Sequence, residues 1–293
     1  MSYKYLEHST DAFIEVKAKN LEEAFLVAGK SVVETIIDLK NIQEVEKRSV
    51  KAKGRNIQNL LYNMAAIYSI DGNIGSGKST LIKELQKNNM DQSIIFIPEP
   101  VDVWNEIKDS SGITILEEFY KNKKKWSFSF QIMAYISRLA QLKEFIKNNP
   151  GAILITERST HTDRYVFAQM LFDDGNINEI DMQIYLRWFD EFMKDIPIKG
   201  IIYVKTLPIK CFERVKKRGR KGEIIPIEYL ERCHAYHQNW LINKKNILIL
   251  DGNQEYDDKN FLITKWKEKI LKFVEKRKKS PELKYLKEFR NHC

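Results

Sequence analysis

The residues of this chain whose types and spacing best suit chemistry lie in one glycine-rich segment, residues 72–80. The segment contains the pattern Gly-x-x-x-x-Gly-Lys-Ser, which is typical of a loop that binds nucleotide phosphates. Its glycines let the backbone wrap closely around an anion, and the amides at the start of a following helix would donate to phosphate. We expect Lys78 to reach the β- and γ-phosphates and Ser79 to hold Mg²⁺. The predicted ATP-binding residues of this loop are Gly72, Asn73, Ile74, Gly75, Ser76, Gly77, Lys78, Ser79 and Thr80.

Carboxylates and an arginine follow two apolar segments farther along the chain. Glu99 stands between prolines just after residues 94–97, and Glu157 and Arg158 directly follow residues 152–156. A carboxylate at the end of a strand can accept the proton of a hydroxyl group, and a guanidinium group matches phosphate oxygens. A structural carboxylate, or an internal Glu–Arg ion pair, is the alternative. Together with the phosphate loop, these residues indicate phosphoryl transfer to a hydroxyl group.

A third group of charged residues, at 214–220, contains Arg214, Arg218 and Arg220. Guanidinium groups bind phosphate oxygens with paired hydrogen bonds, and they stabilise the charge that spreads in the transition state of phosphoryl transfer. We therefore predict an arginine-rich lid over the ATP phosphates, to which Gly219 gives flexibility. A solvated helix face is the alternative interpretation of this segment.

The elements that must position these residues alternate between short apolar segments and amphipathic ones. Strands are expected at residues 66–70, 94–97, 152–156, 201–205 and 247–250. Helices are expected at residues 80–86, 113–121, 127–147, 180–194, 208–217, 226–242 and 261–276. This alternation predicts an α/β fold with a five-stranded parallel sheet flanked by helices. Ligands of such sheets bind beyond the carboxyl ends of the strands, where the charged residues above are expected.

Residues 1–63 differ in pattern from the rest of the chain. The elements expected there are strands at 13–16 and 49–52 and helices at 21–37 and 57–61. None of these elements continues the alternation that begins at residue 66. We therefore predict two domains, residues 1–63 and residues 64–293.

The composition narrows the class of protein. The chain has 293 residues, of which 43% are hydrophobic, so it can bury a sizeable core. It lacks a run of about 18 apolar residues, as a membrane span requires, and its first residues lack the pattern of a signal peptide. Its three cysteines lack metal-type spacing, which favours a cytoplasmic location. The net charge of +9 is spread along the chain and suits small anionic ligands, so neither a membrane nor a nucleic acid is expected as partner.

Taken in order, the motifs of about residues 65–255 resemble those of the deoxynucleoside kinases, closest to the deoxycytidine and deoxyguanosine kinase branch. Besides the phosphate loop, the resemblance rests on residues 98–104, Tyr120, residues 126–131 with Arg138, residues 157–165, residues 214–220 and residues 250–253. It implies a P-loop kinase that phosphorylates the 5′-hydroxyl group of deoxynucleosides with ATP and Mg²⁺, in nucleotide salvage. It also implies a homodimer.

The resemblance assigns roles to the charged residues. Glu99 would accept the proton of the 5′-hydroxyl group, Arg158 would bind near the reacting 5′-oxygen, and Glu157 would help Ser79 to hold Mg²⁺. The predicted catalytic residues are Glu99, Arg158, Lys78, Arg214 and Arg218. The rest of the ATP site would consist of Arg214, Arg218, Arg220, Asp251 and Asn253.

The resemblance also implies a pocket for the nucleoside. Gln131 matches a glutamine that binds the base, and Arg138 and Asp163 match a charged pair that bonds purine or cytosine edges and leaves less room for the thymine methyl group. We therefore expect deoxycytidine and purine deoxynucleosides to be better substrates than thymidine. The predicted substrate-binding residues are Glu99, Trp104, Phe119, Tyr120, Gln131, Arg138, Arg158, Asp163, Phe167 and Glu223, with Tyr120 and Glu223 at the sugar 3′-hydroxyl group.

The start of the chain resembles the N-terminal half of archease, a small protein that assists RNA ligases. This resemblance rests on residues 5–12, Tyr-Leu-Glu-His-Ser-Thr-Asp-Ala, and residues 20–25, Asn-Leu-Glu-Glu-Ala-Phe. It implies a small α+β archease-like fragment that is truncated near residue 63. This start leaves an RNA-processing accessory protein open as an alternative function. The phosphate loop leaves two more open: a nucleoside monophosphate kinase, and a regulatory protein that binds nucleotide without turnover.

Overall fold

The computed structural model describes residues 2–6, 13–17, 27, 65–87, 91, 93–149, 151–194, 196–220, 222–254 and 261–278. The chain divides into two compact units, Met1–Val50 and Lys51–Cys293, and each is considered by itself. In the first unit, β1 (Ser2–Leu6) and β2 (Phe13–Lys17) pair antiparallel, so the strand expected at residues 13–16 is confirmed. Apart from Val27, the other elements expected before residue 64 lie outside the described residues, and the predicted domain boundary stays a prediction.

The short apolar segments of the second unit form one parallel sheet, as predicted. Its strands are β3 (Ala66–Asp71), β4 (Ile94–Ile97), β5 (Ile153–Glu157), β6 (Ile198–Lys205) and β7 (Ile247–Asp251). They follow the order β4-β5-β3-β6-β7. Every residue of β3 is buried, because this strand lies in the middle of a sheet that is covered on both faces. The order places the carboxyl ends of β4, β5 and β3 side by side.

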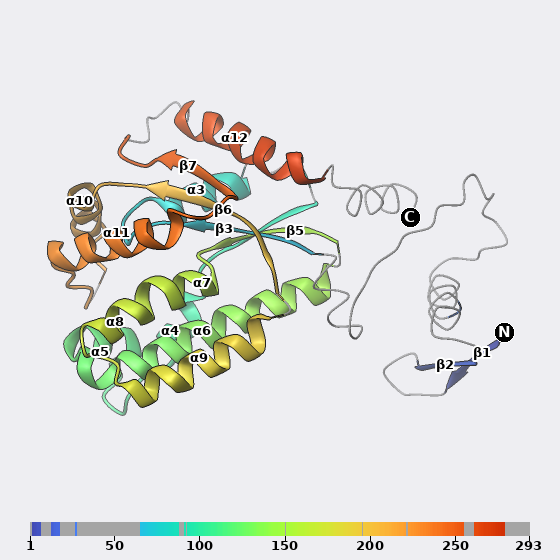
Figure 1. Cartoon of the computed structure of the whole chain (residues 1–293), viewed down its shortest axis with the longest axis horizontal. Helices are drawn as coiled ribbons and strands as arrows, with labels where there is room; N and C mark the ends of the chain where they lie inside the picture. Colours follow the sequence, from blue (N-terminus) through green and yellow to red (C-terminus); the bar gives the residue numbers. More distant parts are fainter. Residues whose placement is uncertain are drawn as a thin grey trace. The chain divides into compact units, whose positions relative to one another are not determined.

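Helices cover the two faces of this sheet (Figure 1). On one face, α3 (Lys78–Lys87) and α12 (Phe261–Lys278) share an apolar core with the strands. On the other face, α5 (Ile115–Lys121), α6 (Lys123–Asn148) and α9 (Glu179–Met193) enclose a second core. A third core joins α10 (Pro208–Arg218) and α11 (Ile227–Leu241) to residues 166–170. Within the described residues, no helix is both long enough and apolar enough to cross a membrane.

Some helical segments differ from the sequence-based expectation. The sequence pattern predicts neither α4 (Val101–Glu106) nor the continuous turns of α7 (Thr160–Thr162), η2 (Asp163–Ala168) and α8 (Gln169–Asp173). The η2 segment is a π-helix, whose wide turn departs from the 3.6-residue period by which helices are found in a sequence. Helix α6 begins at Lys123, before the expected residue 127, because the Asn122 side chain caps it by accepting a hydrogen bond from Lys125 N.

Gly219 has a role at the end of a helix that was not predicted from the sequence. It follows the last residue of α10 with a φ of 58°, in the left-handed region. Its backbone N–H donates to Val215 O over 3.2 Å, which satisfies a carbonyl group of the last turn. Gly219 therefore ends the helix that carries Arg214 and Arg218, and the flexibility that it was expected to give the lid stays a prediction.

Candidate active site

A cleft of about 640 Å³ lies beyond the carboxyl ends of β3, β4 and β5. It brings together most of the predicted site residues, namely Ile74, Gly75, Gly77, Lys78, Ser79, Thr80, Glu99, Trp104, Phe119, Tyr120, Gln131, Arg138, Glu157, Arg158, Asp163, Phe167, Arg214, Arg218, Arg220 and Glu223. The predicted residues that do not line it are Gly72, Asn73, Ser76, Asp251 and Asn253.

The phosphate loop connects β3 to α3 and depends on its glycines. Gly75 has a φ of 79°, and a Cβ atom there would lie 2.5 Å from the carbonyl oxygen of Cys211. Lys78 Nζ donates to Asn73 O over 2.7 Å, and Asn73 Nδ2 donates to Leu230 O over 2.8 Å. Asn73 thus holds the loop against α11, which explains why its side chain does not line the cleft.

Lys78 should take up a proton when ATP binds. Burial, together with the nearby Arg158, lowers the pKa of its ammonium group from 10.5 to about 7. Bound phosphates would favour the charged form, so the uptake should occur above about pH 7. We expect calorimetry at about pH 8, in buffers of different ionisation enthalpy, to show uptake of close to one proton. Lys78→Arg, whose charge does not titrate in this range, should abolish the uptake, and equal uptake in both proteins would contradict this prediction.

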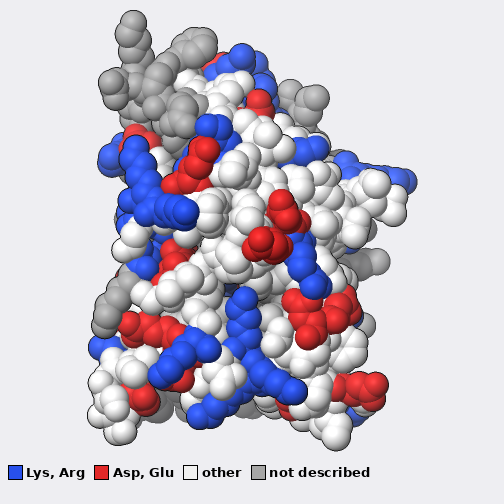
Figure 2. Space-filling model, turned by 90° about the vertical axis from the view of Figure 1, so that its left-hand side faces the viewer, with Lys and Arg blue, Asp and Glu red and all other residues white. Residues whose placement is uncertain are grey.

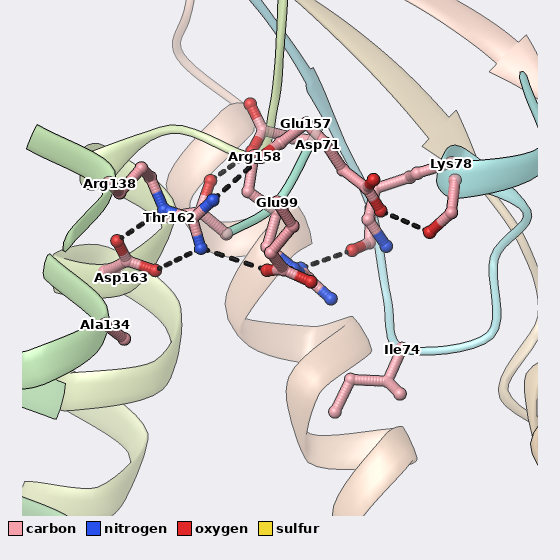
Figure 3. Close-up of polar contacts among 12 residues, drawn as sticks. Asp71, Ile74, Lys78, Glu99, Ala134, Arg138, Glu157, Arg158, Thr162 and Asp163 are labelled. Carbon is pink, nitrogen blue, oxygen red and sulfur yellow. Dashed lines mark hydrogen bonds and ion pairs between the residues drawn. The ribbon is translucent and has the colours of Figure 1, made fainter. Parts of the chain in front are cut away.

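Glu99 lies just beyond β4, between a charged pair and the phosphate loop (Figure 3). Its Oε1 is 3.0 Å from Arg138 Nη2 and 3.2 Å from Arg158 Nε. Burial by itself would raise the pKa of this carboxyl group, but Arg158 and Arg138 outweigh that effect and lower the pKa to about 2. Glu99 is therefore ionised at neutral pH and can accept a proton.

Arg138 and Asp163 form a buried ion pair at the inner end of the cleft. Arg138 Nε donates to Asp163 Oδ2 over 3.0 Å, and Arg138 Nη1 donates to the backbone oxygen of Glu157 over 2.8 Å. The exposed fractions of the two side chains are 4% and 3%. The structure thus brings together the two residues expected to recognise the base, and it also joins Arg138 to Glu99.

Arg158 and Glu157, at the end of β5, face the phosphate loop. Arg158 has a φ of 62°, which makes it the one non-glycine residue of the described chain with a positive φ. Its Nη1 donates to Gly72 O over 2.8 Å, and Ser79 Oγ donates to Glu157 Oε1 over 2.5 Å. Backbone strain of this kind concentrates at functional sites, where the surrounding structure maintains it.

Aromatic rings form the walls of the inner pocket. Phe119 and Phe130 stack with ring centroids 4.6 Å apart, and Trp104 packs edge-on against Phe130 at 5.7 Å. Gln131 is buried, and its Oε1 has no hydrogen-bond partner among the described residues. A buried acceptor of this kind gains free energy when a ligand supplies a donor. The pocket therefore suits a flat ring with polar groups at its edge.

Tyr120 and Glu223 lie together elsewhere in the cleft. Glu223 accepts a hydrogen bond from Arg218 Nη2 over 2.5 Å, and its other oxygen is 3.8 Å from Arg220 Nη1. Burial raises the pKa of Tyr120 well above its usual range, and the negative charge of Glu223 is the second-largest cause of this rise. A protonated phenol and a carboxylate can together bind a ligand hydroxyl group.

The loop after β7 braces α10, the helix that carries two of the arginines predicted to form a lid. Arg214 donates from Nη1 to Gly252 O over 2.8 Å and from Nη2 to Gln254 O over 3.1 Å. Asn253 Nδ2 donates to Asp251 Oδ1 over 2.8 Å, and Asn253 Oδ1 accepts from Leu207 N over 2.8 Å. Asp251 and Asn253 thus shape this loop, while Arg214 reaches the cleft.

Comparison with known proteins agrees with this arrangement. The family model described as deoxynucleoside kinase matches residues 68–276. The chain belongs to the deoxynucleoside kinase family. This kinase is 36% identical over 242 residues to deoxycytidine kinase 2 of Gallus gallus, which covers 72% of this chain and 91% of that protein. It is 35% identical to the deoxycytidine kinase of Homo sapiens, over 68% of this chain and 89% of that one. It is 34% identical to the mitochondrial deoxyguanosine kinase of Xenopus laevis, over 66% of this chain and 82% of that protein.

A second family model, for the Archease protein family, matches residues 3–95. This match confirms the archease-like start of the kinase. It continues past residue 63, where the resemblance was expected to end, and includes the phosphate loop. Residues 68–95 are therefore matched by both family models.

Several residues that line the cleft of this kinase were not predicted from the sequence, namely Lys83, Pro98, Val101, Leu116, Phe130, Ala134, Lys217 and Tyr229. Ala134 could have been found, because helical spacing puts it on the same face of α6 as Gln131 and Arg138. Phe130, in contrast, is one of several aromatic residues at the start of that helix. Only its packing against Phe119 and Trp104 distinguishes it from the others.

Proposed function

We propose that this kinase transfers the γ-phosphoryl group of ATP to the 5′-hydroxyl group of a deoxynucleoside, as a step of nucleotide salvage. The observation that carries the proposal is the place of Glu99, which is ionised and shares one cleft with the phosphate loop and the aromatic pocket. A phosphate loop alone is compatible with many nucleotide-binding proteins. A carboxylate between that loop and a pocket for a base supports a hydroxyl group as the acceptor.

In the proposed mechanism, most of the rate enhancement comes from positioning the 5′-hydroxyl group against the γ-phosphate of ATP. Both arginine contacts engage Oε1 of Glu99, which leaves Oε2 to accept the proton of the 5′-hydroxyl group. A carboxylate with a pKa near 2 is a weak base, but the loose transition state of phosphoryl transfer requires little activation of the attacking oxygen. Holding the hydroxyl group in line with the phosphorus atom is then the larger contribution.

Cationic side chains would stabilise the phosphates. Lys78 lies at the start of α3, and Arg158 approaches from the end of β5. Arg214 is held in place by the loop after β7, whereas Arg218 is bound by Glu223. These positions surround the cleft from separate elements, and fixed charges of this kind lower the barrier without reorganisation during the reaction.

The chain also has residues that fit Mg²⁺. Ser79 Oγ and Glu157 Oε1 lie 2.5 Å apart at the phosphate loop, and Mg²⁺ prefers such oxygen ligands together with water and phosphate. We propose that these two residues hold the ion, directly or through water. When bound, it would neutralise negative charge on the phosphates of ATP.

We propose deoxycytidine and purine deoxynucleosides as the preferred substrates. The free Oε1 of Gln131 can accept from an exocyclic amino group, and the Arg138–Asp163 pair presents both a donor and an acceptor. Cytosine, adenine and guanine carry amino groups, whereas thymine carries a methyl group that would lie against a buried charge. The names of the relatives, which are deoxycytidine and deoxyguanosine kinases, agree with this preference.

The alternative functions receive less support. A nucleoside monophosphate would bring its own negative charge next to the ionised Glu99, which opposes binding. An RNA-processing role draws on the archease match, but basic and acidic side chains are interspersed on the face shown in Figure 2. RNA affinity that falls steeply with rising salt would favour that role.

One assay tests the proposed function. The full-length protein and a version that starts at Met64 are each incubated with ATP and the four deoxynucleosides, with Mg²⁺ or with a chelator. We expect Mg²⁺-dependent formation of 5′-monophosphates, with thymidine the poorest substrate. Failure to phosphorylate any deoxynucleoside would overturn the proposal. Equal rates for the two proteins would show that residues 1–63 are not needed for turnover. The assay does not test the location of the protein, and a cytoplasmic location stays a prediction.

A homodimer is also proposed, through the exposed face of α9. Ile180, Ile184 and Trp188 recur every fourth residue of this helix and are 70%, 41% and 49% exposed. An apolar stripe on one face of a helix is typical of an interface. We expect light scattering to give twice the chain mass for the wild type and the single-chain mass for Trp188→Glu. A wild-type protein that elutes as a monomer at micromolar concentration would contradict this prediction.

A further inference from the structure

Asp71 is the last residue of β3 and directly precedes the phosphate loop, yet it does not line the cleft. Its side chain is buried, and its carboxylate accepts hydrogen bonds from separate parts of the chain. Ser69 Oγ donates to Oδ2 over 2.5 Å. On Oδ1, the backbone N–H of Ser159 donates over 3.2 Å, and Thr162 Oγ1 donates as well. The proposed reaction gives this buried carboxyl group no direct role.

The partners of Asp71 stand next to residues of the cleft. Ser159 follows Arg158, and Thr162 precedes Asp163, the first residue of η2 (Figure 3). The backbone of Arg158 is tied to the same strand, since its N–H donates to Ile70 O over 2.9 Å. Its side chain donates to the carbonyl oxygen of Gly72, the residue on the other side of Asp71. Ile70 and Gly72, the two neighbours of Asp71 in the chain, therefore hold the backbone and the side chain of Arg158.

The left-handed conformation of Arg158 gives this arrangement a physical role. A φ of 62° is unfavourable for a residue with a side chain and persists only where several contacts enforce it. Ser159 N–H bonded to Asp71 fixes the peptide that follows Arg158, and Thr156 Oγ1, which donates to Arg158 O over 2.7 Å, fixes the carbonyl group of that peptide. Without Asp71, the peptide could turn and Arg158 could relax to a negative φ.

We propose that Asp71 is a positioning residue, which holds Arg158 in its strained conformation and fixes the start of η2 relative to the phosphate loop. The inference rests on the proposed function of Arg158 and Asp163. An aspartate suits this place because the contacting groups donate to both of its side-chain oxygens. Asparagine has the same shape but would turn an N–H₂ group toward one of those donors.

The test compares Asp71→Asn with the wild type, using ATP and deoxycytidine. We expect kcat to fall about 30-fold or more, while KM for each substrate changes by less than about threefold, because a misplaced catalytic group mainly raises the barrier to chemistry. Ser69→Ala is the matched control, since Ser69 bonds Asp71 on the side away from Ser159 and Thr162. It should lower the thermal midpoint and keep kcat within about threefold of the wild type. A folded Asp71→Asn protein with wild-type kcat would overturn the proposal.

A second pair of variants applies if Asp71→Asn does not fold. Thr162→Val removes one donor to Asp71 and keeps the side-chain shape, whereas Thr162→Ser keeps the hydroxyl group. We expect Thr162→Val to lower kcat by about fivefold or more and Thr162→Ser to retain wild-type kcat, and equal kcat values would count against the role of Asp71.

A crystal structure of Asp71→Asn, or of Thr162→Val if the former does not fold, gives a readout that needs no turnover. We expect Arg158 to adopt a negative φ or to lose its bond to Gly72 O, and an unchanged Arg158 would overturn the proposal. If the wild type phosphorylates no deoxynucleoside, the proposed function fails, and the conformation of Arg158 still decides the role of Asp71.

Discussion

Replacing Glu99 with glutamine is expected to lower kcat for deoxycytidine by about 100-fold or more, the usual contribution of a positioned general base. The amide has nearly the same shape, and its oxygen can still accept from the two arginines, but it cannot take the proton of the 5′-hydroxyl group. ATP binding should change little, because Lys78 and the rest of the phosphate loop are unaltered. Steady-state kinetics and calorimetry with ATP measure the two quantities separately.

Glu118→Gln is the matched control for this prediction. Glu118 lies on α5 with its carboxylate 3.9 Å from Lys121 Nζ, and it does not line the cleft. Its replacement should leave kcat within about twofold, since its ion-pair partner Lys121 is 71% exposed and such a pair contributes little. If Glu99→Gln keeps kcat within about threefold of the wild type, Glu99 is not the proton acceptor.

The lowered pKa of Glu99 also predicts how its effect depends on pH. A carboxyl group whose pKa falls from 4.5 to about 2 on folding stabilises the native state fully above the unfolded value. That contribution is lost as the pH falls from about 4.5 towards 2. The difference in unfolding free energy between the wild type and Glu99→Gln should therefore shrink across this range, as denaturant titration would measure. The ionised base should also persist throughout the neutral range, so kcat/KM should show no loss from Glu99 above about pH 4.

The second large effect is expected from replacing both members of the buried ion pair, with Arg138→Leu and Asp163→Ala together. The double variant removes the polar partner for an amino group and makes room for a methyl group. We expect the ratio of kcat/KM for thymidine to that for deoxycytidine to rise by about 100-fold, since one pocket contact discriminates over this range. A ratio within about threefold of the wild type would contradict the assignment of this pair to base recognition.

The two replacements must be made together. Asp163→Ala alone leaves the Arg138 guanidinium, 4% exposed, without one of the two carboxylates that lie 3.0 Å from it, and removing one partner of a buried ion pair destabilises a protein more than replacing both. We therefore expect urea unfolding to show a larger loss of stability for Asp163→Ala than for the double variant. The matched control is Arg164→Leu with Asp190→Ala, an adjacent ion pair with an N–O distance of 2.6 Å that does not line the cleft. It should leave the thymidine preference unchanged.

Much of the fold could be predicted from the sequence because its strands are short, apolar and bounded by turns. The segment 94–97 was found with its observed bounds, and the alternation with helices gave the parallel sheet. The region of η2 could not be found in this way, because this short π-helix has a wider turn than the 3.6-residue period by which helices are found in a sequence. Its residues Asp163 and Phe167 were placed in the site by resemblance, and the structure agrees in placing both in the cleft.

The sequence by itself determined the phosphate loop of this kinase, because the residues that shape it are consecutive and their glycines dictate the local backbone. It also determined the residue types that meet at the site. Only the tertiary structure decided how those residues are paired. The strand order sets the end of β4 beside the end of β5, so Glu99 meets both Arg138 and Arg158, which are distant from it in the sequence. The low pKa of Glu99 is a consequence of that meeting, since charge interactions depend on distances in space. The strained backbone of Arg158 depends on the pairing of β5 with β3, which brings its N–H to Ile70 O and the N–H of Ser159 to Asp71.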